Sequence, residues 1–142
     1  LPTPPPTAVS PGVSGGSERI LLVEDEPAVR DMTRRILERA GYQVVVAEDG
    51  DAALATVDRS TVDFDVLVTD VVMPGTSGIE LAERVLDRSE TVGVVLLSGY
   101  TAETLDLERL LARGARFVAK PVATSELLRA IRDADAVGRA NR

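Results

Sequence analysis

Residues 66–75 read Val-Leu-Val-Thr-Asp-Val-Val-Met-Pro-Gly, an apolar, β-branched run that stops at Asp70 and is soon followed by a Pro-Gly pair. Such a run is typical of a parallel strand that is buried on both faces, and the Pro-Gly pair lets neither a strand nor a helix continue. Three other apolar runs stop in the same way, at Asp25, Ser98 and Lys120. Because the carboxyl ends of parallel strands open onto one edge of a sheet, we expect these four side chains to share one site.

Short β-branched runs alternate with helical patterns from residue 18 onward. The expected strands cover residues 19–24, 43–47, 65–70, 92–98 and 116–119. Between the strands, apolar residues recur at helical spacing on one side, as do Val29, Met32, Ile36 and Leu37. Five strand-helix units of this kind predict a single α/β domain, in which helices cover both faces of a parallel sheet.

Residues with strong local backbone preferences mark several expected helix ends. Pro27 suits a first helical turn, and Gly41 and Gly114 suit the position just after a helix. Ser77 and Glu80 have the spacing of a capping box, in which the Ser side chain accepts a hydrogen bond from the first helical turn. No strand is followed by a Gly-rich phosphate-binding loop.

The bulk composition limits the function. With 142 residues and 44% hydrophobic content, the chain can bury one core of ordinary size. A formal charge of -7 argues against a nucleic-acid interface, which needs clustered Lys and Arg. Without His or Cys, the chain has no imidazole or thiolate for metal ligation, and it could receive a phosphoryl group from a His but not supply that His.

The two ends of the chain differ from its middle. Residues 1–17 hold most of the eight prolines together with Ser, Thr and Gly, which predicts a disordered linker. We expect residues 18–136 to fold as one domain and residues 137–142 to form a C-terminal tail. No apolar run reaches the roughly 18 residues that cross a bilayer, and no signal peptide is evident. We therefore expect a cytoplasmic domain without membrane contact, although its parent protein could be membrane-anchored.

The residues at the strand ends suit phosphoryl chemistry on a carboxylate. Glu24, Asp25 and Asp70 would repel one another at a shared edge unless a cation compensates, so a Mg²⁺ ion held by oxygen ligands is the natural resolution. Ser98 and Lys120 could steady phosphoryl oxygens. Each residue taken singly has a simpler interpretation, because acids and Ser often cap turns or helices and a lysine beside a proline often lies in a solvated turn.

Four motifs in this order carry a family resemblance. They are Leu21-Leu22-Val23-Glu24-Asp25-Glu26, Val68-Thr69-Asp70-Val71-Val72-Met73-Pro74-Gly75, Leu97-Ser98-Gly99-Tyr100 and Phe117-Val118-Ala119-Lys120-Pro121. Through them, residues 18–136 resemble the receiver domain of a two-component response regulator. The resemblance implies a flavodoxin-like (βα)5 fold, doubly wound, with five parallel strands in the order 2-1-3-4-5.

The resemblance also implies a role for each matching residue. Asp70 would accept a phosphoryl group from phosphohistidine, and Lys120 and Ser98 would bind its oxygens. The Mg²⁺ ligands would be Asp25, Asp70, the backbone carbonyl of Val72 and, through water, Glu24. Phosphorylated Asp70 would then attract Ser98, and the aromatic ring of Phe117 would rotate into the vacated space. The bond between Lys120 and Pro121 is expected to be cis.

Two residues near the expected phosphoacceptor depart from the family pattern, and we expect them to affect the rate of dephosphorylation. Val72 offers no polar group to orient an attacking water, and Tyr100 could shade the phosphoryl group, so we expect slow autodephosphorylation. Val72 also stands where a haloacid dehalogenase-like phosphatase, the alternative enzyme class, would carry a second Asp. A pseudo-receiver that binds partners without phosphorylation is a third interpretation, which the complete set of acids, Ser and Lys disfavours.

The expected parent protein is a hybrid sensor histidine kinase that carries this domain at its C-terminus. Leu1-Pro2 resembles the end of the last strand of a histidine-kinase ATPase domain, and a Pro-rich linker into a terminal receiver is the layout of such kinases. A stand-alone single-domain regulator is the alternative. The expected partner is a histidine kinase or a histidine phosphotransfer protein, and phosphorylation could also drive a homodimer.

Overall fold

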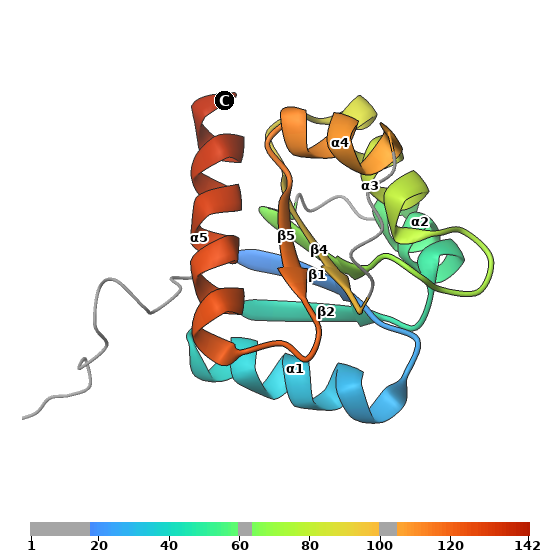
Figure 1. The fold of residues 1–142 in the computed structure, drawn as a ribbon, viewed down its shortest axis with the longest axis vertical. Helices are drawn as coiled ribbons and strands as arrows, with labels where there is room; N and C mark the ends of the chain where they lie inside the picture. The colour runs from blue at the N-terminus through green and yellow to red at the C-terminus, as the bar shows by residue number, and fades with distance from the viewer. Residues whose placement is uncertain (1–17, 60–63, 100–104) are drawn as a thin grey trace, which may run out of the picture.

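The computed structural model describes residues 18–59, 64–99 and 105–142, which alternate strictly between strands and helices (Figure 1). The elements are β1 (Arg19–Val23), α1 (Pro27–Arg39), β2 (Gln43–Ala47), α2 (Gly50–Arg59), β3 (Val66–Asp70), α3 (Gly78–Arg88), β4 (Gly93–Ser98), α4 (Leu105–Ala112), β5 (Arg116–Ala119) and α5 (Thr124–Ala140). Each strand lies within one residue of its expected ends. The linker expected at residues 1–17 lies outside the described residues.

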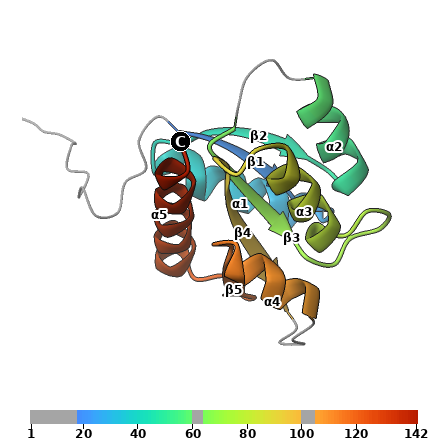
Figure 2. The ribbon, with the colours of Figure 1, turned by 90° about the horizontal axis from the view of Figure 1, so that it is seen from above.

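The strands form one five-stranded sheet in the order β2-β1-β3-β4-β5, and every neighbouring pair is parallel. Seen from above, α1 and α5 lie on one face of the sheet, and α2, α3 and α4 lie on the other (Figure 2). This arrangement confirms the doubly wound, flavodoxin-like fold. The crossovers leave all carboxyl strand ends on the same edge, where ligands of such sheets bind.

Each face of the sheet has its own hydrophobic core, because alternate residues of a strand point to opposite faces. In β1, Ile20 and Leu22 join the core under α1 and α5, whereas Leu21 and Val23 join the core under α2, α3 and α4. The strands β1, β3 and β4 are buried almost throughout. The central strands are therefore held from both sides, and their ends are fixed in space.

The helix ends follow the local signals of the sequence. Pro27 occupies the first turn of α1, and the side chain of Ser77 accepts a hydrogen bond of 3.1 Å from the backbone N–H of Glu80 at the start of α3. Gly41 and Gly114 follow α1 and α4 with φ angles of 101° and 102°. Only glycine adopts this left-handed conformation without a steric penalty, which explains why these helices stop there.

Two expectations about the helices were wrong. Met32 is 57% exposed, because the buried stripe of α1 runs through Thr33 and Leu37, one residue further around the helix. The expected tail at residues 137–142 is mostly helical, since α5 continues to Ala140 and buries Gly138. Even α5, the longest helix in the described part of the chain, is neither long nor apolar enough to cross a membrane, and the same holds for the others.

Candidate functional site

The register of the strands brings the predicted site residues to one edge of the sheet. Val23 in β1 pairs with Thr69 in β3, so Glu24 and Asp70 leave adjacent strands side by side. On the other side of β3, Asp70 pairs with Leu97, which directly precedes Ser98. Ser98 in turn pairs with Ala119, so Lys120 follows beside it. The parallel pairing therefore converts four distant sequence positions into neighbours.

Lys120 is the hub of this site. Its ammonium donates hydrogen bonds to Asp70 Oδ2 at 2.9 Å and to Glu24 Oε1 at 3.0 Å. Its backbone N–H donates to the carbonyl of the buried residue Ser98 at 2.8 Å, which holds Lys120 at the end of the sheet. Of the 16 Lys and Arg residues in the sequence, Lys120 is the single lysine.

The three acids of the site lie close enough to share a cation. Glu24, Asp25 and Asp70 each offer a carboxylate oxygen, and these oxygens lie within 4.8 Å of one another. Glu24 is 1% exposed and Asp70 is 8% exposed. A single Lys ammonium cannot neutralise three carboxylates, and an all-oxygen ligand set with excess negative charge suits Mg²⁺. The residues therefore fit the metal that the sequence suggested.

The electrostatics of the site reflect burial and mutual charge. Burial raises the pKa of the Glu24 carboxyl, and the nearby charge of Asp70 adds to this effect, although hydrogen bonds from Lys120 and from the Glu26 N–H oppose it. For Lys120, burial of the ammonium lowers its pKa, but the hydrogen bonds to Asp70 and Glu24 outweigh burial, so the net pKa shift is upward. The Lys120 side chain is therefore protonated at neutral pH.

Arg30 is a supporting residue that the sequence did not single out. Its guanidinium donates to the backbone carbonyl of Glu24 at 2.8 Å, and the Glu26 N–H donates to Glu24 Oε2 at 3.2 Å. Both contacts fix the turn between β1 and α1 that carries the acids. Arg30 lies one helical turn after the first residues of α1 and can reach back to the strand end, but an Arg at this spacing has no fixed partner, so the sequence alone does not predict the contact.

Of the four remaining predicted residues, the structure describes three. The Lys120-Pro121 bond is cis, as expected. Phe117 is partly buried against the core under α2, α3 and α4. Val72 follows Asp70 in the loop to α3 and is 60% exposed. Tyr100, the second expected tuning residue, lies outside the described residues.

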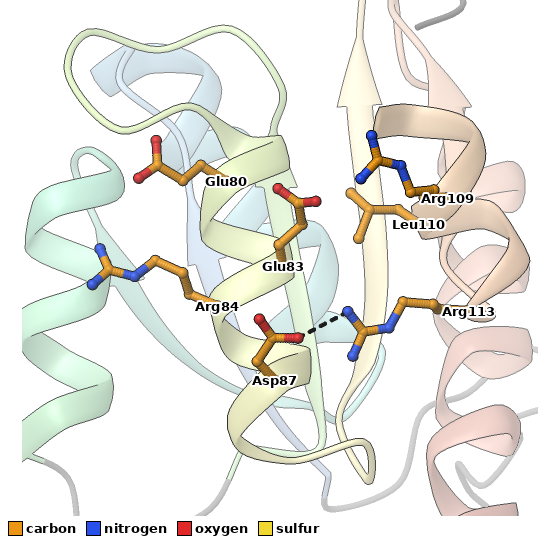
Figure 3. Close-up of a pocket in the computed structure, with 7 residues that line it drawn as sticks. All are labelled: Glu80, Glu83, Arg84, Asp87, Arg109, Leu110 and Arg113. Atoms are coloured by element: carbon orange, nitrogen blue, oxygen red, sulfur yellow. Dashed lines mark hydrogen bonds and ion pairs between the residues drawn. The ribbon is translucent and has the colours of Figure 1, made fainter. Parts of the chain in front are cut away.

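Away from the acidic cluster, a hollow with a volume of about 490 Å³ lies between α3 and α4 (Figure 3). Its lining residues are Glu80, Glu83, Arg84 and Asp87 of α3 and Arg109, Leu110 and Arg113 of α4. Asp87 and Arg113 pair across it at 3.0 Å, and both side chains are solvent-exposed to a substantial degree. Acids and arginines balance along its walls, so the hollow lacks the concentrated charge of the acidic edge.

An open, doubly wound sheet with acids, a Ser and a Lys at its carboxyl edge defines a class of α/β signalling domains. The sequence model of the response regulator receiver domain matches residues 20–132, and the chain belongs to this family. The family resemblance is thereby confirmed. Membership also sets aside the haloacid dehalogenase-like alternative, in agreement with Val72 at the position where such a phosphatase would carry its second Asp.

Relatives of known sequence place the domain in different protein contexts. The chain is 38% identical over 109 residues to the uncharacterized transcriptional regulatory protein YrkP of Bacillus subtilis, covering 77% of this chain and 46% of that protein. It is 32% identical to the response regulator receiver protein CpdR of Brucella abortus, covering 80% of this chain and 93% of that protein. The chain thus spans less than half of the first relative and nearly all of the second.

Solved structures agree with the fold. A CheY-like receiver domain protein of Methanospirillum hungatei superposes with a TM-score of 0.78 at 28% identity, covering 89% of this chain and 100% of that one. The response regulator TrrA of Thermotoga maritima, solved in complex with Mg²⁺ and BeF, superposes with a TM-score of 0.68 at 31% identity, covering 78% of this chain and 92% of that one.

Proposed function

We propose that this domain accepts a phosphoryl group on Asp70 from a phosphohistidine donor in a two-component phosphorelay. The observation that carries the proposal is the Lys120 ammonium bound to Asp70 at 2.9 Å, with two more acids gathered around the same carboxylate. A buried Asp held next to a fixed cation is a nucleophile in a defined orientation. Phosphoryl transfer asks a protein mainly for such positioning and for charge stabilisation.

In the proposed reaction, a carboxylate oxygen of Asp70 attacks the phosphorus atom of the donor. The phosphorus-nitrogen bond breaks, and the imidazole of the donor leaves with the electron pair and takes up a proton. Lys120 stabilises the negative charge on the phosphoryl oxygens, and the hydroxyl of Ser98 donates a hydrogen bond to them. The proposed step transfers no proton from Asp70, so it assigns no residue of this chain the role of a base.

The proposed metal ligands are Asp25, Asp70, the backbone carbonyl of Val72 and, through water, Glu24. The close approach of the three carboxylates supports this set. A bound Mg²⁺ would supply positive charge that screens the acids from each other and from the incoming phosphoryl group. The Mg²⁺ and BeF present in the related TrrA structure support the same chemistry.

The proposed output is a change of surface around α4 and β5. Ser98 ends β4 and Phe117 lies in the adjacent strand β5, so movement of one frees space next to the other. A new charge on Asp70 would draw Ser98 toward it and let the ring of Phe117 turn inward. The event is local, and the readout is a two-state repacking of neighbouring elements.

The parent protein proposed for this domain is a hybrid histidine kinase, and a stand-alone regulator is the second candidate. The Pro-rich composition of residues 1–17 favours the kinase, as a spacer before a receiver. The CpdR relative, of which this chain covers 93%, favours the stand-alone form. The full-length coding sequence decides between them. In either case the donor is a histidine kinase or a histidine phosphotransfer protein.

The test is the intact mass of the domain after incubation with acetyl phosphate and Mg²⁺. We expect the wild-type domain to gain one phosphoryl group, whereas Asp70→Asn and a sample with EDTA gain none. A wild-type domain that is folded and gains no phosphoryl group from acetyl phosphate or from a phosphorylated kinase would be a pseudo-receiver, and the proposal would be wrong.

A further inference from the structure

The loop of residues 71–77, between β3 and α3, carries Val72 and is closed at its neck. The N–H of Gly78 donates to the carbonyl of Val71 at 2.9 Å, and Met73 is buried in the core. A Cβ atom on Gly78 would lie 2.0 Å from the carbonyl oxygen of Asp70, so the two ends of the loop touch. These contacts fix the two ends of the loop and Met73. They do not fix the outer part of the loop, from Pro74 to Thr76, which we call its outer arc.

The outer arc is held by the first turn of α2. The hydroxyl of Thr76 donates a hydrogen bond of 2.5 Å to Asp51 Oδ1. Gly75 has a φ of +74°, and a Cβ atom there would lie 2.8 Å from Asp51 Oδ2. A Cβ atom on Gly50 would lie 2.3 Å from the carbonyl oxygen of Thr76. Two glycines thus let the loop and the helix come into direct contact around the Asp51 carboxylate.

The helix that carries Asp51 is itself well anchored. At its start, the side chain of Asp49 accepts a hydrogen bond of 2.8 Å from the N–H of Ala52. Ala53 is fully buried in the core, and Asp58 near the helix end forms an ion pair with Arg88 of α3. A contact with Asp51 therefore ties the loop to a fixed element rather than to a free surface.

We infer that Asp51 is a positioning residue of the metal site. It acts through Thr76 on the loop of residues 71–77, and so orients the carbonyl of Val72 toward the acidic cluster. The inference rests on the proposed function, because Val72 is a proposed ligand. If the carbonyl already points in its binding direction before the ion arrives, less conformational entropy is lost on binding. Mutation of residues that orient metal ligands typically lowers metal affinity about tenfold or more.

The test is the Mg²⁺ affinity of the unphosphorylated domain, measured by titration calorimetry. We expect Thr76→Val to bind Mg²⁺ about tenfold more weakly and Thr76→Ser, which keeps the hydroxyl, to bind nearly as the wild type does. Thr76→Val leaves the Asp51 carboxylate at the start of α2, so any benefit of that charge to the helix is preserved. The double variant Asp51→Ala/Thr76→Val should bind Mg²⁺ no more weakly than either single variant, because both substitutions remove the same hydrogen bond.

Two further readouts separate positioning from general stability. Hydrogen exchange at the Val72 and Met73 amides should become faster in Thr76→Val. Phosphorylation by acetyl phosphate should need more Mg²⁺ for half-saturation, while its rate at saturating Mg²⁺ recovers. The matched control is Asp58→Asn, which removes the ion pair of α2 with Arg88 but no contact with the loop, and should leave Mg²⁺ affinity unchanged.

The outcomes distinguish the inference from the proposed function. If the wild type binds Mg²⁺ and is phosphorylated on Asp70, and Thr76→Val binds Mg²⁺ equally well, the role of Asp51 is overturned and the proposed function stands. An equal loss in Asp58→Asn would also overturn it, since general loosening of α2 would then suffice. If the wild type takes up neither Mg²⁺ nor phosphoryl, both fail together.

Discussion

At the scale of single residues, the site depends on one cation shared between two buried acids. The Lys120 ammonium lies 2.9 Å from Asp70 and 3.0 Å from Glu24, while its own backbone continues the sheet. Removing a single partner from a buried, hydrogen-bonded charge pair is costly, because the other charge stays buried and unpaired. Lys120 therefore serves the fold and the proposed chemistry at once, and its loss would disturb both.

Val72 is the residue whose substitution should change the lifetime of the phosphorylated state. Its side chain is 60% exposed in the loop after Asp70 and offers no polar group to hold a water. We expect Val72→Asn to shorten the lifetime about tenfold, equivalent to about 1.4 kcal/mol of the barrier, because the amide could orient an attacking water. Loss of protein-bound phosphoryl after removal of the donor, followed by intact mass, measures it.

Val72→Ile is the control for this change, because it preserves an apolar side chain at the same position. Its lifetime should match that of the wild type. A lifetime that is unchanged or longer in Val72→Asn would contradict the idea that slow autodephosphorylation arises from the apolar residue at this place.

The sequence predicted which residues meet at the carboxyl edge of the sheet, but not the contacts that hold the neighbouring loops. Asp70, Ser98 and Lys120 were predictable because each ends an apolar strand, and parallel strands share their carboxyl edge. The roles of Arg30 and Asp51 were not predictable. Arg30 holds a backbone carbonyl, and Asp51 meets Thr76, which is 25 residues away along the chain. Neither contact leaves a local pattern, so only the folded chain reveals it.

At the scale of elements, α5 approaches the start of β4 closely. A Cβ atom on Gly93 would lie 2.4 Å from the carbonyl oxygen of Ala134, and one on Gly138 would lie 2.4 Å from that of Thr91. In both cases the obstacle is backbone, which cannot rotate away as a side chain can. The two glycines therefore set how near α5 packs to the sheet.

Gly93→Ala should consequently destabilise the domain. We expect the free energy of unfolding to fall by about 2 kcal/mol, because the added methyl group forces α5 away from β4. Urea unfolding followed by circular dichroism measures the change. The control is Gly99→Ala, since a Cβ atom on Gly99 meets nothing within 4 Å and should alter stability by less than about 0.5 kcal/mol. Equal stability of the two variants would show that α5 can shift freely.

The same scale shows where sequence patterns fall short. The run of valines in β2 looks like a buried strand, yet Val45 and Val46 are 43% and 41% exposed because β2 lies at the edge of the sheet. Strand order is a property of the crossovers and not of any one strand, so composition alone could not identify the edge. In α1, the buried stripe includes the polar residue Thr33. The pattern of apolar residues alone therefore did not predict which side of the helix is buried.

At the scale of the whole molecule, the pole opposite the acidic edge is closed by ion pairs between segments distant in the sequence. Arg139 near the end of α5 pairs with Glu18 at 2.6 Å, and Arg142 pairs with Asp65 at 2.8 Å. Surface pairs of this kind are individually worth about 0–1 kcal/mol. Of these charges, Glu18 and Arg139 also act on Tyr42, whose side chain is buried.

Tyr42 should make the stability of the domain depend on alkaline pH. Burial raises its pKa from 10.0 to about 12, and the charges of Glu18 and Asp135 add to this effect. Between these two values the folded phenol keeps its proton and the unfolded phenol loses it, so the unfolded state binds fewer protons and stability falls as pH rises. The contribution is complete below pH 10 and amounts to about 2.7 kcal/mol, from two pKa units at about 1.36 kcal/mol each.

Urea unfolding of the wild type and Tyr42→Phe across this pH range tests the expectation. The wild type should lose more stability than the variant does, whereas parallel pH profiles would contradict it. A second measurement follows phenolate absorbance in Tyr100→Phe. Because the sequence has two tyrosines, this variant leaves Tyr42 as the only phenol, and its titration should be delayed toward pH 12.

The single lysine described at the hub of the site has a consequence for covalent chemistry. Every side-chain amine reaction available to this sequence, such as acylation, reductive alkylation or crosslinking, converges on Lys120. The hydrogen bonds that keep its ammonium protonated also slow such reactions, since only the free amine is nucleophilic. Acylation of a side-chain amine in this domain therefore removes the cation beside Asp70 in the same event, so acyl labelling and loss of that charge cannot be separated.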